Sequence, residues 1–238
     1  MAREQLNGVP YNWHAFSARP DLAAALAGRV AGRLTDAIEE RGAALLAVSG
    51  GTTPAKFFAA LSNIPITWSK VTVTLVDERF VPASSPRSNA GLVAANLLQN
   101  AAAAARFVPL YQEGASSEDV AASDSRMLRS LHWPLDVVVL GMGTDGHTAS
   151  FFPDADDLEK LLDPSSTRVV LPVHAPSAGE PRLTLSLARI VSAGFIALHI
   201  ESEDKRTAFE AAMGPGTPKP IRAVLDAAER PVEVFWAP

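Results

Sequence analysis

The stretch Asp136-Val-Val-Val-Leu-Gly-Met-Gly-Thr-Asp-Gly-His-Thr-Ala-Ser-Phe-Phe-Pro153 decides the fold of this chain. Its apolar run, Val137 to Leu140, is short and branched, as in a strand that is covered on both faces. The glycines that follow let the backbone turn sharply and approach a ligand closely. Asp145 and His147 then stand two residues apart. This pattern fits a ligand site at the edge of a sheet, and it also fits a polar turn with a surface histidine.

Strands and helices alternate along the rest of the chain. Strands are predicted at 43–48, 70–76, 137–140, 169–173, 182–187, 195–200 and 232–236, and helices at 22–41, 54–61, 89–100, 116–132, 154–163, 202–212 and 221–228. Prolines make residues 1–20 irregular in this prediction, and Asp21 is expected to cap the first helix. The alternation predicts an α/β fold with a mostly parallel, Rossmann-like sheet and helices on both faces. No long linker interrupts it, so we expect a single domain over 1–238.

Composition narrows the classes of function. The chain has 238 residues, 47% hydrophobic and 20% charged, as in an ordinary soluble globular protein. The formal net charge of −5 argues against nucleic acid as a partner, because nucleic acids are bound by basic surfaces. The absence of cysteine excludes disulfides, thiolate metal ligands and a cysteine nucleophile. No segment has the form of a membrane span or a signal peptide, so we expect a cytoplasmic protein without a membrane partner.

Three polar clusters follow predicted strands, namely Ser49 to Thr52, Asp77 to Arg79, and Gly141 to His147. Because the carboxyl ends of parallel strands lie at one edge of a sheet, we expect these clusters to converge. The first cluster, Ser49-Gly50-Gly51-Thr52, opens a predicted helix, whose free N–H groups favour an anion. A simple glycine turn with a threonine cap fits it as well. The cluster matches neither of the common nucleotide-binding motifs, so a nucleotide is not supported.

The chemistry of the other two clusters is also open to two interpretations. Arg79 offers a fork of donors that suits phosphate, although an Asp–Arg surface pair is the ordinary alternative. Asp77 stands directly at the strand end and is expected to point inward. The ordinary pKa of a histidine side chain, about 6.5, lies close to neutral pH, so a histidine such as His147 suits general-base catalysis. The histidines show no metal-ligand spacing, and no serine-nucleophile motif is present, so no metal site is expected.

Several motifs together resemble the 6-phosphogluconolactonase family. They are Val48-Ser-Gly-Gly-Thr-Thr-Pro54, Val76-Asp-Glu-Arg-Phe-Val-Pro82 with Ser88-Asn89, the stretch from Leu140 to Pro153, Pro181-Arg-Leu-Thr-Leu185 and Lys205. The resemblance covers nearly the full length in the family's order. It implies a fold similar to that of glucosamine-6-phosphate deaminase and ribose-5-phosphate isomerase. It also implies a hydrolase of the pentose phosphate pathway, without metal or cofactor, that converts 6-phospho-D-glucono-1,5-lactone and water to 6-phosphogluconate.

The resemblance also implies roles for individual residues. His147 would remove a proton from water for attack on the C1 carbonyl, and Asp145 and Asp77 would orient His147 or the sugar hydroxyls. The 6-phosphate would lie near the loop of Ser49, Gly50, Gly51 and Thr52, held by Arg79, Arg182 and Lys205. Without the resemblance, Arg182 and Lys205 are simple surface charges. Backbone N–H groups from Gly143 to His147 are candidates for the oxyanion site. The expected partner is a small-molecule substrate, and the expected state is a monomer or weak dimer.

Two other functions remain open at this point. Glucosamine-6-phosphate deaminase resembles this chain in its Gly-Gly loop, its Asp-Glu pair and its Asp-Gly-His motif. That family has a carboxylate just before the proline, where this chain has Phe152. An apolar ring cannot do acid–base work, which disfavours ring opening by isomerisation. A non-catalytic sugar-phosphate-binding domain would use the same polar residues, although the retained His147 favours an enzyme.

Overall fold

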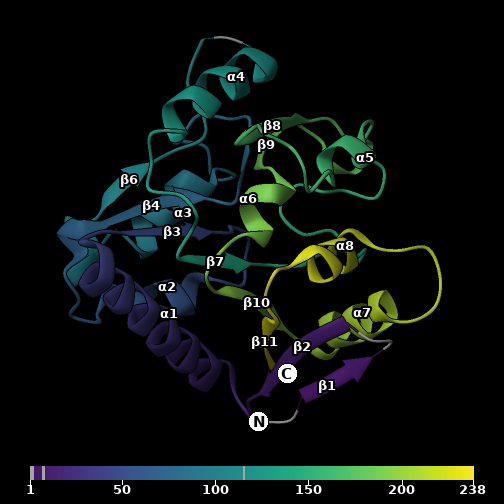
Figure 1. Cartoon of the computed structure of the whole chain (residues 1–238), viewed down its shortest axis with the longest axis horizontal. Coiled ribbons are helices and arrows are strands. Elements are labelled where there is room, and N and C mark those ends of the chain that lie inside the picture. Colours follow the sequence, from purple (N-terminus) through teal and green to yellow (C-terminus); the bar gives the residue numbers. More distant parts are fainter. Residues whose placement is uncertain (1–2, 7–8, 115) are drawn as a thin grey trace.

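A central sheet of eight strands organises the computed structural model, which describes residues 3–6, 9–114 and 116–238 (Figure 1). Its strands are β1 (Arg3–Leu6), β2 (Val9–Ala15), β3 (Ala44–Val48), β4 (Val71–Leu75), β6 (Arg106–Val108), β7 (Val137–Leu140), β10 (Ile196–Glu201) and β11 (Val232–Ala237). Their order is β1-β2-β11-β10-β7-β3-β4-β6, and only β1 and β2 pair antiparallel. The predicted α/β fold with a mostly parallel sheet is confirmed.

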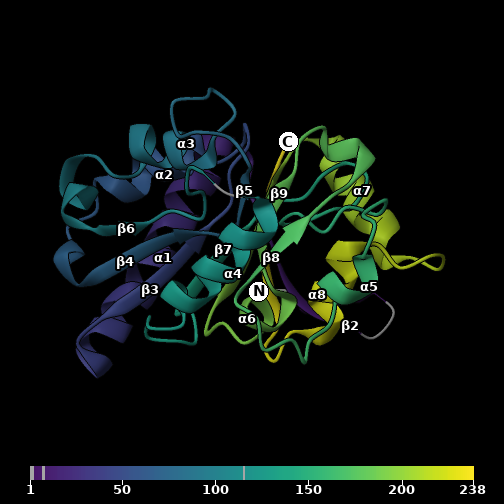
Figure 2. The same cartoon turned by 90° about the horizontal axis from the view of Figure 1, so that it is seen from above.

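Helices cover this sheet. They are α1 (Arg19–Arg41), α2 (Ala55–Ser62), α3 (Asn89–Asn96), α4 (Ser117–Leu128), α5 (Leu158–Leu161), α6 (Leu187–Val191), α7 (Glu203–Met213) and α8 (Pro220–Ala227), with short 3₁₀ helices at Trp68–Lys70, Asn100–Ala104 and Pro176–Ala178. Helix α1 packs on α2, β3, β7 and β11, whereas α7 contacts β10 and α8 contacts β2. Figure 2 shows α1 to α3 in one half of the molecule and α7 with α8 in the other.

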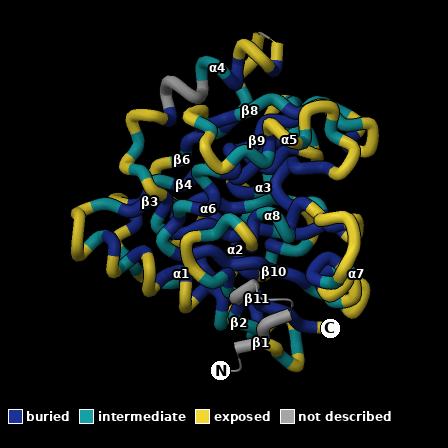
Figure 3. Tube along the Cα trace, turned by 45° about the vertical axis from the view of Figure 1, so that its right-hand side comes forward, coloured by how far each residue is buried: buried dark blue, intermediate teal, exposed yellow. Residues whose placement is uncertain are grey.

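Strand β7, which begins the stretch quoted first, lies in the middle of the sheet between β3 and β10. All four of its residues are buried, as are all five of β3. Figure 3 shows buried residues gathered in the middle of the molecule and exposed residues on the outer loops and helix faces. A strand with both faces covered needs apolar side chains on both faces, which explains the unbroken Val-Val-Val-Leu run.

The structure also contains a second, smaller sheet. Strands β5 (Asp77–Arg79), β9 (Arg182–Leu185) and β8 (Val170–Val173) form it, and they pair antiparallel. The strands predicted at 169–173 and 182–187 are present as β8 and β9, but they belong to this second sheet, which the sequence pattern did not predict. The chain leaves β4 at Val76 and joins a new partner at Asp77, so Arg79 lies directly opposite Arg182. Pairing between residues about a hundred positions apart leaves no local signal in the sequence.

Other boundaries also differ from the prediction. Residues 1–20 are not irregular where the structure describes them, since β2 pairs with the closing strand β11. Asp21 does not cap α1; the N-cap is Ala18, which makes no side-chain hydrogen bond, and Asp21 lies in the first turn. The acidic segment 154–163 holds only the single turn of α5. Within the described residues, no helix is both long and apolar enough to cross a membrane.

Candidate active site

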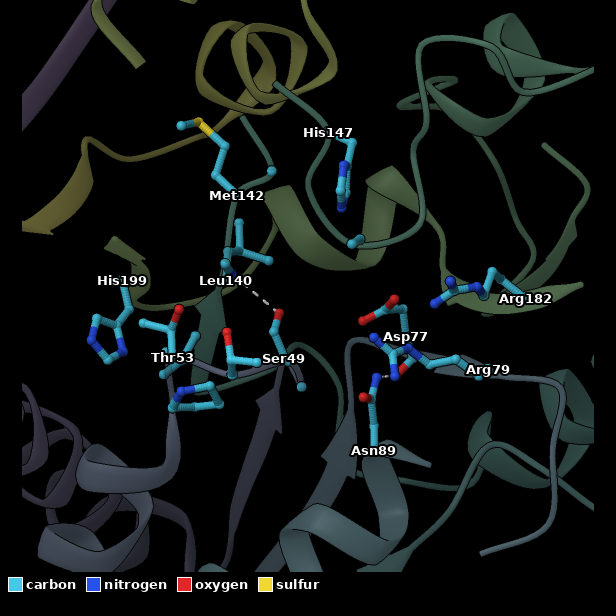
Figure 4. Close-up of a pocket in the computed structure, with 18 of the residues that line it drawn as sticks. Ser49, Thr53, Asp77, Arg79, Asn89, Leu140, Met142, His147, Arg182 and His199 are labelled. Carbon is cyan, nitrogen blue, oxygen red and sulfur yellow. Dashed lines mark hydrogen bonds between the residues drawn. The ribbon is translucent and has the colours of Figure 1, made fainter. Parts of the chain in front are cut away.

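A cavity of about 340 Å³ lies at the carboxyl ends of β3, β7 and β10, next to β5 and β9 (Figure 4). The predicted site residues that line it are Ser49, Gly50, Gly51, Thr52, Asp77, Arg79, His147, Arg182 and Lys205. Asp145 does not line this cavity, but it contacts the Nδ1 atom of His147, which does. The three polar clusters therefore converge as expected from the strand ends. Among the described residues, no group of three His, Asp or Glu side chains has the arrangement of a metal site.

His147 is held by the loop that follows β7. Its Nδ1 lies 2.6 Å from Asp145 Oδ1, and its backbone N–H donates to the same oxygen at 3.1 Å. A carboxylate can only accept, so Nδ1 donates to Asp145, and a neutral ring in this tautomer has its lone pair on Nε2. Figure 4 shows the ring reaching into the cavity. Gly143 permits this arrangement, because a Cβ there would stand 2.2 Å from His147 Nδ1.

The loop uses most of its own backbone donors. Gly143 N–H donates to the carbonyl of His147, and Gly146 N–H donates to the carbonyl of Gly143. The N–H of His147 is bound to Asp145, as described above. These three N–H groups are therefore not available to an oxyanion. Of the backbone donors expected from Gly143 to His147, only the remaining ones can contribute to the oxyanion site.

Asp145 is strongly stabilised as a carboxylate. Partial burial opposes its ionisation, but the hydrogen bonds from the ring and backbone of His147 outweigh burial and hold the pKa of Asp145 at about 2. This pKa lies below the ordinary value for the unfolded chain, so the charge contributes to folding above about pH 4. The contribution is lost as the pH falls toward the folded-state pKa.

We therefore expect acid to destabilise the wild-type protein more than an Asp145→Asn variant. The difference in urea unfolding midpoint between the two should shrink as the pH falls from about 5 to about 2, since the wild-type carboxylate becomes protonated in that interval. The effect is modest because the side chain is 43% exposed and is screened by solvent. A constant difference across this interval would contradict the proposed charge interaction.

Asp77 and Glu78 point in opposite directions from β5. Asp77 is 8% exposed, lines the cavity, and accepts a hydrogen bond from Ser150 Oγ at 2.7 Å. Glu78 is fully buried on the other side, where it binds the first turn of α3, whose N-cap is Ser88. It accepts hydrogen bonds from the backbone N–H groups of Arg79, Asn89 and Ala90 and from Ser88 Oγ, at 2.8 to 3.0 Å. Burial raises the pKa of Glu78, and these hydrogen bonds oppose that shift.

Arg79 and Arg182 form a pair of adjacent cations on neighbouring strands. Arg182 is only 7% exposed, and the Nε atoms of both side chains are buried without a hydrogen-bond partner among the described residues. Burial lowers the pKa of Arg182, and the charge of Arg79 lowers it further. The buried Arg182 and the partly buried Arg79, each with an unused Nε donor, favour an anionic ligand. Arg182 is therefore not a simple surface charge.

Phe152 connects this arginine pair to His147. Its ring centroid lies 4.5 Å from that of the His147 ring, and the guanidinium of Arg182 lies 5.5 Å from the Phe152 ring. The position that carries an acid in the deaminases is therefore filled here by an apolar ring that packs on the histidine. The sequence shows that this residue is a phenylalanine, and the structure shows that it contacts His147 and Arg182.

The loop between β3 and α2 forms the floor of the cavity. Gly50 lies against Asn89, where a Cβ would stand 1.8 Å from Asn89 Oδ1, so no larger residue fits without a shift. Ser49 Oγ accepts a hydrogen bond from Gly141 N–H at 3.3 Å, which ties the first cluster to the third. Within the described part of the chain, no side chain caps α2, so the threonine cap considered from the sequence is not formed and the first N–H groups of the helix can serve a ligand.

Lys205 reaches the cavity from the first turn of α7. Ser202 caps this helix, accepting from Lys205 N–H at 3.4 Å. Lys205 Nζ donates to the carbonyl of Met142 at 2.6 Å, and burial lowers the pKa of Lys205 while Asp145 opposes that shift. The N-terminal end of a helix dipole disfavours a cation. A partly buried lysine in the first turn is therefore consistent with an anion nearby.

Two lining residues were given no role by the sequence interpretation. Asn89 belongs to the Ser88-Asn89 motif, and its Nδ2 donates to the carbonyl of Asp77 at 2.8 Å. His199 lies near the end of β10 and is 3% exposed. A histidine within an otherwise apolar strand, close to its carboxyl end, is the signal that could have identified it.

The fold and the cavity together define an α/β enzyme with a pocket for a small anionic substrate. The chain belongs to the family described as glucosamine-6-phosphate isomerases/6-phosphogluconolactonase, whose model matches residues 17–236. A 6-phosphogluconolactonase of Mesorhizobium japonicum is 80% identical over 238 residues, which is 100% of both chains. One of Rhizobium meliloti is 53% identical over 95% of this chain and 99% of its own. The crystal structure of a 6-phosphogluconolactonase from Shewanella baltica has a TM-score of 0.92 at 39% identity, covering 96% of this chain and 98% of that chain.

Proposed function

We propose that this protein hydrolyses 6-phospho-D-glucono-1,5-lactone to 6-phospho-D-gluconate in the oxidative pentose phosphate pathway. The observation that carries the proposal is the His147–Asp145 pair beside a cavity that is also lined by the arginine pair of Arg79 and the buried Arg182. A base beside an anion site is what hydrolysis of a phosphorylated lactone requires. The family and the names of the similar proteins support the same reaction.

In the proposed mechanism, His147 acts as the general base. Nε2 takes a proton from a water molecule, and the resulting hydroxide attacks the C1 carbonyl carbon of the lactone. The tetrahedral intermediate collapses as the bond from C1 to the ring oxygen breaks. The imidazolium then returns its proton to the leaving oxygen, which becomes the 5-hydroxyl. Asp145 stabilises the imidazolium in between, since its carboxylate accepts the Nδ1–H bond.

The other predicted residues hold the substrate in this proposal. The 6-phosphate lies by the Ser49–Thr52 loop, and Arg79, Arg182 and Lys205 supply the positive charge that faces it, the two arginines from the other side of the cavity. Asp77 uses one oxygen for Ser150 and offers the other to a sugar hydroxyl. No cofactor takes part. A cytoplasmic location and a monomeric or weakly dimeric state remain predictions from the sequence.

The test is lactone hydrolysis at neutral pH, measured as acid release and corrected for the spontaneous reaction. We expect the purified protein to accelerate hydrolysis of the 6-phosphorylated lactone. Ammonia release from glucosamine 6-phosphate examines the deaminase alternative, and Phe152 leads us to expect none. Tight binding of 6-phosphogluconate without any acceleration would instead identify a non-catalytic binding domain.

Replacing Arg182 with methionine should raise the KM for the phosphorylated lactone by roughly 10- to 100-fold, because a charge-assisted hydrogen bond is lost. We expect kcat to change much less, since Arg182 packs on Phe152, which lies between it and the His147 ring. Arg182→Lys should recover only part of the loss, because lysine has no planar fork. Arg106→Met, which removes an exposed strand arginine, is the control. An unchanged KM in Arg182→Met contradicts the assignment.

A further inference from the structure

A second histidine, His199, lines the same cavity and plays no part in the mechanism above. It comes from β10, its side chain is only 2% exposed, and its ring meets that of Phe57 in α2 edge-on with centroids 6.2 Å apart. Figure 4 shows His199 next to Thr53, on the opposite side of the cavity from Arg182. The ring is thus fixed in the cavity wall near the start of α2.

The two ring nitrogens of His199 have different surroundings. Nε2 lies 3.1 Å from Glu201 Oε1. Burial opposes the ionisation of Glu201. The hydrogen bond from His199 and the charges of His199, Arg19 and Lys56 outweigh burial and hold the pKa of Glu201 below the ordinary value. Glu201 is therefore a carboxylate, which can only accept a hydrogen bond. Nε2 therefore carries a proton and donates it to Glu201. The other nitrogen, Nδ1, is left as the group that can meet a ligand.

Nδ1 of His199 is buried and has no hydrogen-bond partner among the described residues. An unsatisfied buried polar atom is costly and calls for a ligand or an ordered water as its partner. Three features near it favour an anion: the uncapped N-terminus of α2, the glycine loop that precedes it, and Lys205, which lines the same cavity. Among the described residues, the acidic side chain that lines the cavity is Asp77, which stands beside the arginine pair and not at this end.

We propose that His199 is a substrate-binding residue whose Nδ1 hydrogen-bonds the 6-phosphate of the substrate from the Thr53 side, with Glu201 orienting the ring. The hydrogen bond between His199 Nδ1 and the phosphate oxygen needs one proton, which either partner can supply. A protonated ring donates it to the phosphate dianion, or a phosphate monoanion donates it to the neutral ring. The second pKa of a phosphate monoester is about 6, so either form is available near neutral pH. The contact makes His199 a determinant of selectivity for phosphorylated over unphosphorylated lactone. This inference rests on the proposed lactonase function.

The experiment compares the binding of 6-phospho-D-gluconate and D-gluconate by calorimetry. His199→Leu should weaken binding of the phosphorylated product by roughly 10- to 100-fold and leave the weak binding of gluconate unchanged. His199→Asn, whose amide can place a donor near the position of Nδ1, should recover a large part of the affinity. In turnover, the loss should appear in KM, with kcat within about threefold of wild type, because the contact is made equally in ground and transition states.

His174→Leu is the matched control, since His174 pairs with Glu118 through Nε2 at 2.8 Å but stands on the surface, away from the cavity. It should leave both affinities unchanged. An unchanged affinity in His199→Leu would mean that Nδ1 meets only water. An equal loss for both ligands would mean that it meets a sugar hydroxyl. Either result overturns the proposal.

A second measurement does not depend on how well the variants fold. In protein labelled with ¹⁵N-histidine, the Nδ1 resonance of His199, assigned with His199→Asn, should move on addition of 6-phosphogluconate or inorganic phosphate and stay in place on addition of gluconate. No response to either phosphate overturns the proposal. The lactonase function is examined separately with wild-type protein. If wild type neither hydrolyses the lactone nor binds 6-phosphogluconate, the proposed function itself has failed; if only the variants are unaffected, the role of His199 alone is wrong.

Discussion

His147→Ala lowers kcat for hydrolysis of 6-phosphogluconolactone by roughly 10²- to 10⁴-fold, the usual contribution of a positioned general base. The variant removes Nε2, which in our proposal takes the proton from the attacking water. KM should change little, since the phosphate and hydroxyl contacts come from other residues. The measurement is the steady-state rate of acid release at neutral pH after subtraction of the spontaneous reaction.

Two further variants make this result specific. Asp145→Asn keeps the shape of the pair but can no longer stabilise the imidazolium or fix the Nδ1–H tautomer, so it should also lower kcat. His174→Ala removes an exposed histidine far from the cavity and should leave kcat unchanged. Full activity in His147→Ala would show that water is activated by another group. A loss in KM alone would place His147 in binding instead of proton transfer.

Glu78→Ala lowers the free energy of unfolding by about 3 to 5 kcal/mol, because each buried donor left without an acceptor costs about 1–3 kcal/mol and several lose their acceptor together. The carboxylate is fully buried and accepts four hydrogen bonds from the β5 backbone and the first turn of α3. Without it, the N–H groups of Asn89 and Ala90 and the hydroxyl of Ser88 lose their acceptor. The measurement is equilibrium urea unfolding followed by circular dichroism.

The matched control is Glu39→Ala, which removes an exposed glutamate from α1 and should change the unfolding free energy by less than about 0.5 kcal/mol. Glu78→Ala should also impair activity at temperatures where it is folded. Asn89 is positioned by Glu78 and packs against Gly50, so a shift at α3 is transmitted to the loop beneath the substrate. Equal stability in the two variants would show that the Glu78 network contributes nothing net to folding.

The sequence predicted most of the fold for a clear physical reason. Strands such as Ala44–Val48 and Val137–Leu140 are buried on both faces, so their apolar runs are continuous and locally visible. The convergence of the three polar clusters followed from the parallel arrangement of these strands and is confirmed by the cavity. The short strand Asp77–Arg79 and the N-terminal strand Val9–Ala15 were missed, because their pairing partners are remote in the sequence.

The candidate site divides in the same way. The sequence alone determined which chemical groups are available: a histidine two residues after an aspartate, a glycine loop at a helix start, and a phenylalanine where related deaminases carry an acid. These features are local, so residue identity and spacing specify them. Only the tertiary structure decided that Arg79 faces Arg182, that Glu78 is committed to α3, and that His199 enters the cavity with an unpartnered nitrogen. Those facts depend on non-local pairing and on burial, which determine whether a polar atom meets water, another residue or a substrate.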